Sequence, residues 1–152
     1  MYQRILVPID GSAASEQGLN EAIRIAKAVH ARLRLIHVVD ELSFAFTVSA
    51  YRYQAGELLD LLRKDAEKLL LTALEKVKAA DVEADTVLYE NLDKTVKQRV
   101  LDESLSWKAD LIVIGTHGRR GANRLLLGSS AEGIMRGATV PVLLVRAPEE
   151  TS

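Results

Sequence analysis

The sequence contains no cysteine, which excludes disulfide bonds, thiolate metal sites and cysteine catalysis. Long hydrophobic runs are also missing, because no window approaches the roughly 20 apolar residues of a membrane span. The first apolar stretch, Ile5–Val7, soon meets Pro8 and Asp10, far short of the about 7 residues that a secretory h-region needs. We therefore expect a cytoplasmic protein with no membrane insertion.

An excess of either charge is absent as well. The 20 basic and 21 acidic residues leave a formal charge of −1, so we expect no general electrostatic binding to nucleic acid or to an anionic membrane. With 152 residues, 48% of them hydrophobic and 27% charged, the composition is that of one globular domain. We place this domain at residues 1–147 and a polar tail at residues 148–152.

Short apolar runs alternate with helical patterns along the whole chain. The runs predict buried strands at residues 5–9, 33–39, 82–89, 111–114 and 141–145. Between them, apolar residues at helical spacing predict helices that begin after Ser12 or Ser15, near Leu59, after Asp93 and after Gly128. This alternation predicts an α/β fold, a single doubly wound open sheet of parallel strands with helices on both faces.

Residues 40–54 form the longest stretch without a clean period, and they carry four aromatic side chains. We interpret this stretch as a long loop. Long loops in compact domains often act as lids, whereas aromatic residues can also cap the edge of a core, and the sequence leaves both readings open.

Two predicted strand ends carry unusual residues, the stretches Pro8–Ser12 and Gly115–Gly118. In open α/β sheets, ligands bind beyond the carboxyl ends of the strands, at the point where the strand order reverses. Asp10 lies at one of these ends, where its carboxylate could orient a ribose or a metal, or could cap the turn at Gly11 and Ser12.

Glycines recur between Gly115 and Ser130, and they leave room for a ligand to approach the backbone. Gly128, Ser129 and Ser130 open a predicted helix, where unpaired N–H groups and the helix dipole favour an anion. The stretch has no Gly-Lys-Ser/Thr sequence and is therefore not a P-loop. Its basic residues could balance the charge of a polyphosphate, and they are Arg119, Arg120 and Arg124.

The spacing Gly115-x2-Gly118-x9-Gly128-Ser129 resembles the ATP-binding subgroup of the universal stress protein family, whose members are UspA-like. The stretches Ile5–Ser12, Ala109–Gly115 and Pro141–Arg146 look like other hallmarks of the family, so the resemblance covers essentially the whole chain. It implies a five-stranded sheet in the order 3-2-1-4-5, with ATP across the ends of the first and fourth strands and Mg²⁺ accompanying the nucleotide. It also implies a homodimer formed through the strand at residues 141–145.

Positions carried over from the resemblance give a set of nucleotide contacts. Asp10 would lie near the ribose or the adenine edge, Val38 would contact adenine, and the helix start at Gly128 would hold phosphate oxygens. With Arg119 added for its charge, the candidate nucleotide-binding residues are Pro8, Ile9, Asp10, Val38, Ile114, Gly115, His117, Gly118, Arg119, Gly128, Ser129 and Ser130. Ala131 departs from the pattern, because some ATP-binding members have another hydroxyl there.

The same pattern lacks obvious catalytic residues, since fast phosphoryl transfer needs a positioned base or water and a carboxylate that holds a metal. No protein metal site is expected, and we interpret His37, which alternates with apolar residues, as a hydrogen-bonded core residue. The leading hypothesis is an ATP-binding regulatory protein of the stress response that signals through occupancy or dimer state. The alternatives are a slow ATPase or nucleotidyl-transferring enzyme on the same site, and a dimeric scaffold whose loop binds stray anions.

Overall fold

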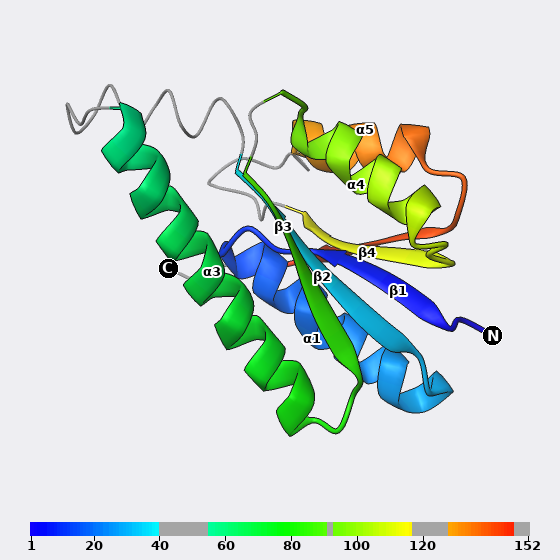
Figure 1. The fold of residues 1–152 in the computed structure, drawn as a ribbon. Helices are drawn as coiled ribbons and strands as arrows, with labels where there is room; N and C mark the ends of the chain where they lie inside the picture. The colour runs from blue at the N-terminus through cyan, green and yellow to red at the C-terminus, as the bar shows by residue number, and fades with distance from the viewer. Residues whose placement is uncertain (40–54, 91–92, 117–127, 148–152) are drawn as a thin grey trace, which may run out of the picture.

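Five parallel strands form one sheet in the computed structural model, which describes residues 1–39, 55–90, 93–116 and 128–147 (Figure 1). The strands are β1 (Arg4–Pro8), β2 (Arg32–Val38), β3 (Ala84–Tyr89), β4 (Leu111–Thr116) and β5 (Val142–Arg146). The helices are α1 (Ala13–Val29), α3 (Ala55–Ala79), α4 (Val96–Ser106) and α5 (Ser129–Gly137). The spatial order β3-β2-β1-β4-β5 confirms the predicted order 3-2-1-4-5.

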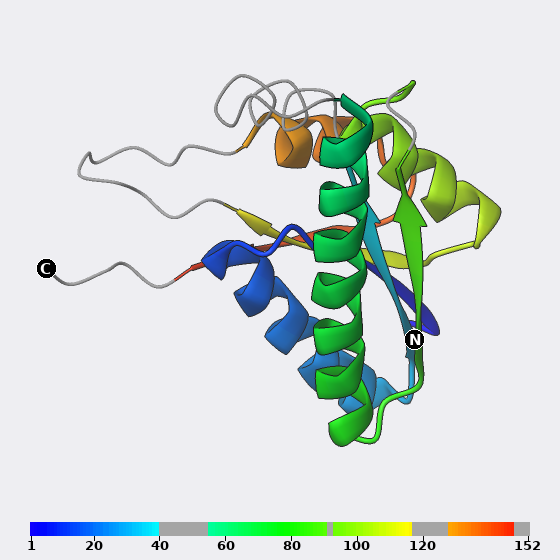
Figure 2. The same cartoon turned by 60° about the vertical axis from the view of Figure 1, so that its left-hand side comes forward.

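Two hydrophobic cores lie on opposite faces of the sheet, because successive residues of each strand point to opposite sides. Ile5 and Val7 of β1 pack in the core beneath α1 and α3. Leu6, between them, packs in the second core beneath α4 and α5 (Figures 1 and 2). All three side chains are fully buried, as the continuous apolar run predicts for a strand covered on both faces.

The sheet splits between its central strand, β1, and the neighbouring strand β4. β1 and β4 are paired only at Ile5 with Leu111 and at Leu6 with Ile112. By contrast, the pairing of β1 with β2 continues to Pro8, and the pairing of β4 with β5 continues to Thr116. The carboxyl ends of β1 and β4 therefore diverge at the switch point of the sheet, which is where open α/β sheets bind ligands.

Helix α1 reaches the backbone of β4 at this split. Gly115 has no side chain, and a Cβ there would overlap the carbonyl oxygen of Ala14 and lie 2.6 Å from the amide nitrogen of Ser15. The approach is reciprocal, since a Cβ on Gly18 would lie 2.9 Å from the amide nitrogen of Gly115. Two glycines thus allow the first turns of α1 to pack directly on β4, which fixes where the turn before α1 lies.

A buried carboxylate holds α4 against the edge of the sheet. Glu103 of α4 is 5% exposed, and it accepts hydrogen bonds from Arg34 of β2 at 2.8 Å and from the Tyr89 hydroxyl of β3 at 2.5 Å. Arg34 also forms two hydrogen bonds with Asp85, at 2.8 and 2.9 Å, and its guanidinium lies 4.7 Å from the centre of the Trp107 ring. The charge of Glu103 is therefore paired where it is buried, as a buried charge requires.

Some predicted boundaries are wrong. Asp93 does not cap α4, because Thr95 is the N-cap and forms a capping box with Gln98. Asp93 instead pairs with Arg99 at 2.7 Å. Strand β3 begins at Ala84 rather than at residue 82. Helix α3 begins at Ala55, directly after the predicted loop at residues 40–54.

The loop predicted at residues 40–54 lies outside the described residues. Among the helices that the structure describes, none is both long enough and apolar enough to cross a membrane.

Gly115→Ala tests the contact between α1 and β4. The new methyl group has no room against the Ala14 carbonyl, so we expect this variant to lose about 3 kcal/mol of unfolding free energy. Gly56→Ala in α3 is the matched control, because nothing lies within 4 Å of the added methyl group, and this change is expected to be neutral or to stabilise by up to about 1 kcal/mol. Urea denaturation measures both variants. Equal stability of the two would contradict the close approach.

Tyr89→Phe tests the hydrogen bond to Glu103. The pKa of Tyr89 is raised, first by this hydrogen bond and then by burial, so the folded protein keeps the phenol proton where the unfolded chain, from about pH 10, begins to lose it. The stabilisation is therefore fully present below about pH 10 and disappears as the pH rises through the raised pKa of the folded state. We expect the variant to lose about 1–3 kcal/mol at neutral pH. Its difference from the wild type should shrink in denaturation curves above pH 10, and a constant difference would refute this origin of the stability.

Candidate functional site

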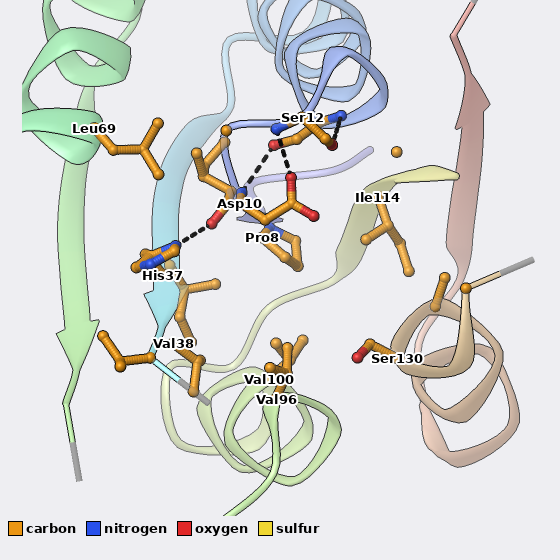
Figure 3. A pocket seen from close by; sticks show the side chains of 18 of the residues that line it. Pro8, Asp10, Ser12, His37, Val38, Leu69, Val96, Val100, Ile114 and Ser130 are labelled. Carbon is orange, nitrogen blue, oxygen red and sulfur yellow. Dashed lines mark hydrogen bonds between the residues drawn. The ribbon is translucent and has the colours of Figure 1, made fainter. Parts of the chain in front are cut away.

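A cavity of about 720 Å³ opens where β1 and β4 diverge (Figure 3). This volume lies within the range of about 300–1,000 Å³ that is usual for small-molecule sites. The wall is formed by the carboxyl ends of β1, β2 and β4, the turn before α1, one side of α3, and the first turns of α4 and α5. Segments more than a hundred residues apart in the sequence therefore meet around one space.

Every candidate residue that the structure describes lines this cavity. These residues are Pro8, Ile9, Asp10, Val38, Ile114, Gly115, Gly128, Ser129 and Ser130. His117, Gly118 and Arg119 lie outside the described residues. The sequence thus predicted candidate residues on four separate segments, and the fold brings these four segments together around the cavity.

One end of the cavity is apolar. Val38 at the end of β2 lies across from Val96 and Val100 of α4, and Pro8 and Ile114 face the cavity from the carboxyl ends of β1 and β4 (Figure 3). Val38 and Val100 are buried against the second core, so their positions are fixed by packing. A flat apolar group such as a nucleobase can be buried between these two valines, with the hydrophobic effect as the driving force.

The start of α5, which packs beside α4, forms a second end of the cavity and exposes main-chain donors. The first turn of any helix has N–H groups without an intrahelical partner. Side chains cap the starts of α1 and α4, through Ser12 and Thr95 respectively. At Gly128, the N-cap of α5, no described side chain makes such a bond, and the Ser130 hydroxyl points toward Val96 and Val100 (Figure 3). This end of the cavity can therefore accept an anion.

The turn after β1 places a carboxylate at the mouth of the same cavity. One carboxylate oxygen of Asp10 accepts a hydrogen bond from the amide of Ser12 at 2.8 Å, and Gly11 has a φ of 84°, in the left-handed region that glycine adopts easily. The other oxygen is directed toward the side of Ile114 (Figure 3). Asp10 therefore caps the turn, as one reading of the sequence predicts, and its carboxylate also faces the cavity. That it orients a ribose or a metal stays a prediction.

His37 is hydrogen-bonded, but it does not lie in the core. Its side chain is half-buried and lines the cavity, with Nδ1 2.6 Å from the carbonyl oxygen of Ile9. The prediction that His37 lies in the core is therefore wrong, whereas the prediction that it is hydrogen-bonded is confirmed. The sequence pattern could not distinguish a core position from a cavity position, because His37 lies near the end of β2, where the core gives way to the cavity.

Sequence reasoning missed the wall contributed by α3. Four residues of α3 line the cavity: Leu62, Ala66 and Leu69, which belong to the apolar stripe that the sequence assigns to the core, and Asp65, which does not. Asp65 is a second carboxylate in the wall. Ser15, which is 5% exposed, was also missed as a lining residue. Among the described residues, no group of three or more potential ligands could hold a metal ion.

Comparison with known sequences gives one consistent result. The sequence model of the universal stress protein family matches residues 1–146. Universal stress protein MJ0531 of Methanocaldococcus jannaschii is 36% identical over 152 residues, with 99% of this chain and 85% of that protein covered. Universal stress protein YxiE of Bacillus subtilis is 31% identical over 151 residues, with 96% of this chain and 100% of that protein covered.

Solved structures have the same fold. The hypothetical protein MJ0577 superposes with a TM-score of 0.80 at 22% identity, with 99% of both chains covered. A universal stress protein in complex with cAMP has a TM-score of 0.62 at 23% identity, covering 97% of this chain and 98% of that one. A universal stress protein from Archaeoglobus fulgidus in complex with dAMP has a TM-score of 0.66 at 19% identity, covering 95% and 98%.

Proposed function

The chain belongs to the universal stress protein family, and we propose that it is an ATP-binding regulatory member that holds the nucleotide in the cavity between β1 and β4. In this proposal Mg²⁺ accompanies the nucleotide, and partners read the occupancy of the site or the dimer state during stress. The protein is cytoplasmic in this proposal, and its activity as an enzyme is at most weak hydrolysis.

The observation that carries the proposal is the polarity of the cavity. Its apolar end, at Val38 and Val100, suits a base, and its other end, at the start of α5, suits phosphates. The carboxylate of Asp10 lines the same cavity, where a hydroxyl of a ribose can donate to it. A site for simple anions would need the second end alone.

Structural neighbours support the class of ligand. The complexes of other universal stress proteins with cAMP and dAMP show that this fold accommodates an adenine base, a sugar and a phosphate. ATP is the finer proposal, and it rests on the glycine spacing between Gly115 and Ser129 and on the arginines of that stretch. Mg²⁺ would be held mainly by the phosphates, as is usual for this ion.

Regulation follows from which elements the nucleotide would contact. The cavity wall includes the turn before α1 and the starts of α4 and α5, so a bound nucleotide would connect the turn before α1 with two helices that lie on the other face of the sheet. Binding to the folded state alone stabilises it by about 2.7 kcal/mol when the ligand is at 100 times its dissociation constant. A partner would read occupancy where the nucleotide favours one arrangement of these elements over another.

Slow hydrolysis is the second candidate, because two carboxylates, Asp10 and Asp65, line the cavity. A carboxylate can orient a water molecule or a metal ion. Release of inorganic phosphate from ATP that is lost in Asp10→Ala or in Asp65→Ala would favour this candidate over a purely regulatory role.

We also propose a homodimer through residues 141–145. In the described structure β5 pairs with β4 alone, which leaves one edge of an apolar strand unpaired. Sedimentation equilibrium at micromolar protein is expected to give twice the chain mass. A monomer at every concentration would contradict the dimer and leave the nucleotide site untouched.

Calorimetric titration with Mg-ATP tests the proposed function, and Gly128→Val is the variant that probes the site. The backbone at Gly128, with φ −58° and ψ 148°, is allowed for valine, so the fold should survive while the side chain stands between the α5 amides and the phosphates. We expect saturable binding by the wild type and a loss of about tenfold or more in the variant.

Gly56→Val is the control for the substitution itself, since Gly56 faces open space and does not line the cavity. It should bind ATP like the wild type. No heat of binding at millimolar Mg-ATP would refute the proposed function. Equal affinity for ATP, AMP and inorganic phosphate would instead indicate a scaffold that binds stray anions.

A further inference from the structure

We propose that His37 and Ser15 are positioning residues that aim Asp10 into the cavity by clamping a single peptide group, the one that joins Ile9 to Asp10. The carbonyl oxygen of Ile9 lies 2.6 Å from Nδ1 of His37, and the amide of Asp10 donates to Oγ of Ser15 at 3.1 Å. This inference rests on the proposed function, because it assigns the aimed carboxylate to recognition of the nucleoside.

The two side-chain hydrogen bonds of the clamp hold the backbone directly beyond the end of the pairing between β1 and β2. Strand β1 ends at Pro8, and the last main-chain bond that continues its pairing with β2 runs from the amide of Ile9 to the carbonyl of Ile36, at 2.8 Å. The next peptide group has no main-chain partner among the described residues, so two side chains from other elements fix its plane. One comes from β2 and the other from α1 (Figure 3).

The carbonyl partner also fixes the state of the imidazole. A carbonyl oxygen can only accept a hydrogen bond, so Nδ1 of His37 must carry the hydrogen. In the neutral side chain Nε2 then carries no hydrogen and acts as an acceptor. This Nδ1–H tautomer can be measured.

Ser15 is itself held tightly from two directions. Its amide donates to Oγ of Ser12 at 3.1 Å, and its main chain packs on Gly115, where an added Cβ would lie 2.6 Å from its nitrogen. Only a residue without a Cβ at position 115 lets the first turn of α1 lie close enough for Oγ of Ser15 to reach the amide of Asp10. Gly115 therefore contributes to the nucleoside end of the cavity through α1.

The consequence is a pre-oriented carboxylate. With its peptide group held at both ends, Asp10 also accepts from the amide of Ser12 at 2.8 Å, and its second oxygen remains available on the cavity side (Figure 3). Orientation before binding raises affinity, because the cost of ordering is met in the free protein. Loss of the clamp should weaken contacts to the nucleoside and spare those to the phosphates at α5.

The experiment compares His37→Leu with His37→Asn in the full chain. The amide nitrogen of asparagine stands at the same number of bonds from the main chain as Nδ1 and can donate to Ile9, whereas leucine cannot. We expect the leucine variant to bind Mg-ATP and AMP about tenfold more weakly, from the loss of about one hydrogen bond, and to bind inorganic tripolyphosphate like the wild type. The asparagine variant should recover most of the loss.

A double-mutant cycle with Asp10→Ala separates positioning from general loosening. If His37 acts through Asp10, then His37→Leu should weaken ATP binding no further in the Asp10→Ala background. Wild-type affinity in the leucine variant, an equal loss for tripolyphosphate, or full additivity in the cycle would each overturn the positioning role.

Nitrogen-15 NMR of the imidazole tests the clamp without any nucleotide. We expect the Nδ1–H tautomer in the free wild type and a shift of the Asp10 amide resonance in Ser15→Ala. An Nε2–H tautomer would overturn the clamp whether or not nucleotide binds. Absence of ATP binding by the wild type, with the Nδ1–H tautomer present, would refute the proposed function and leave the clamp as a feature of the fold.

Discussion

The direct contact between the main chains of α1 and β4 is the constraint on which the site depends. Gly115 and Gly18 remove the side chains that would hold the two elements apart, so the start of α1 enters the split between β1 and β4. That position determines where Ser12 and Ser15 lie, and these two serines organise the turn that carries Asp10. This one close approach thus governs where the carboxylate of Asp10 lies at the mouth of the cavity.

The two helix starts of α1 and α5 face the same cavity but differ in whether a side chain caps them. At the start of α1, the hydroxyl of Ser12 accepts a hydrogen bond from the amide of Ser15. This helix start therefore forms part of the wall without offering that amide to an anion. The first turn of α5 begins at Gly128 with no side-chain cap among the described residues, and its donors remain for a ligand. The cavity therefore has one structural helix start and one that suits phosphate, which gives a bound nucleotide a direction.

The sequence predicted the fold class and, through the family resemblance, the strand order, because buried strands and glycine spacing are local patterns. It also located Asp10, Val38 and Gly128 correctly at strand and helix ends, although their role in binding stays a prediction. The cap at Thr95 was readable as Thr-x-x-Gln and was missed.

The cavity wall on α3, at Leu62 and Asp65, was not readable, because a helical stripe looks the same against a core and against a cavity. The bond from His37 to Ile9 joins residues 28 positions apart, and no local pattern encodes it.

The most direct test of the account is a crystal structure of the protein grown with Mg-ATP. The account predicts the adenine between Val38 and Val100, the ribose beside Asp10, and the phosphates against the amides that follow Gly128. A nucleotide bound elsewhere on the molecule, or a cavity closed by the protein's own side chains with no room for the base, would contradict it.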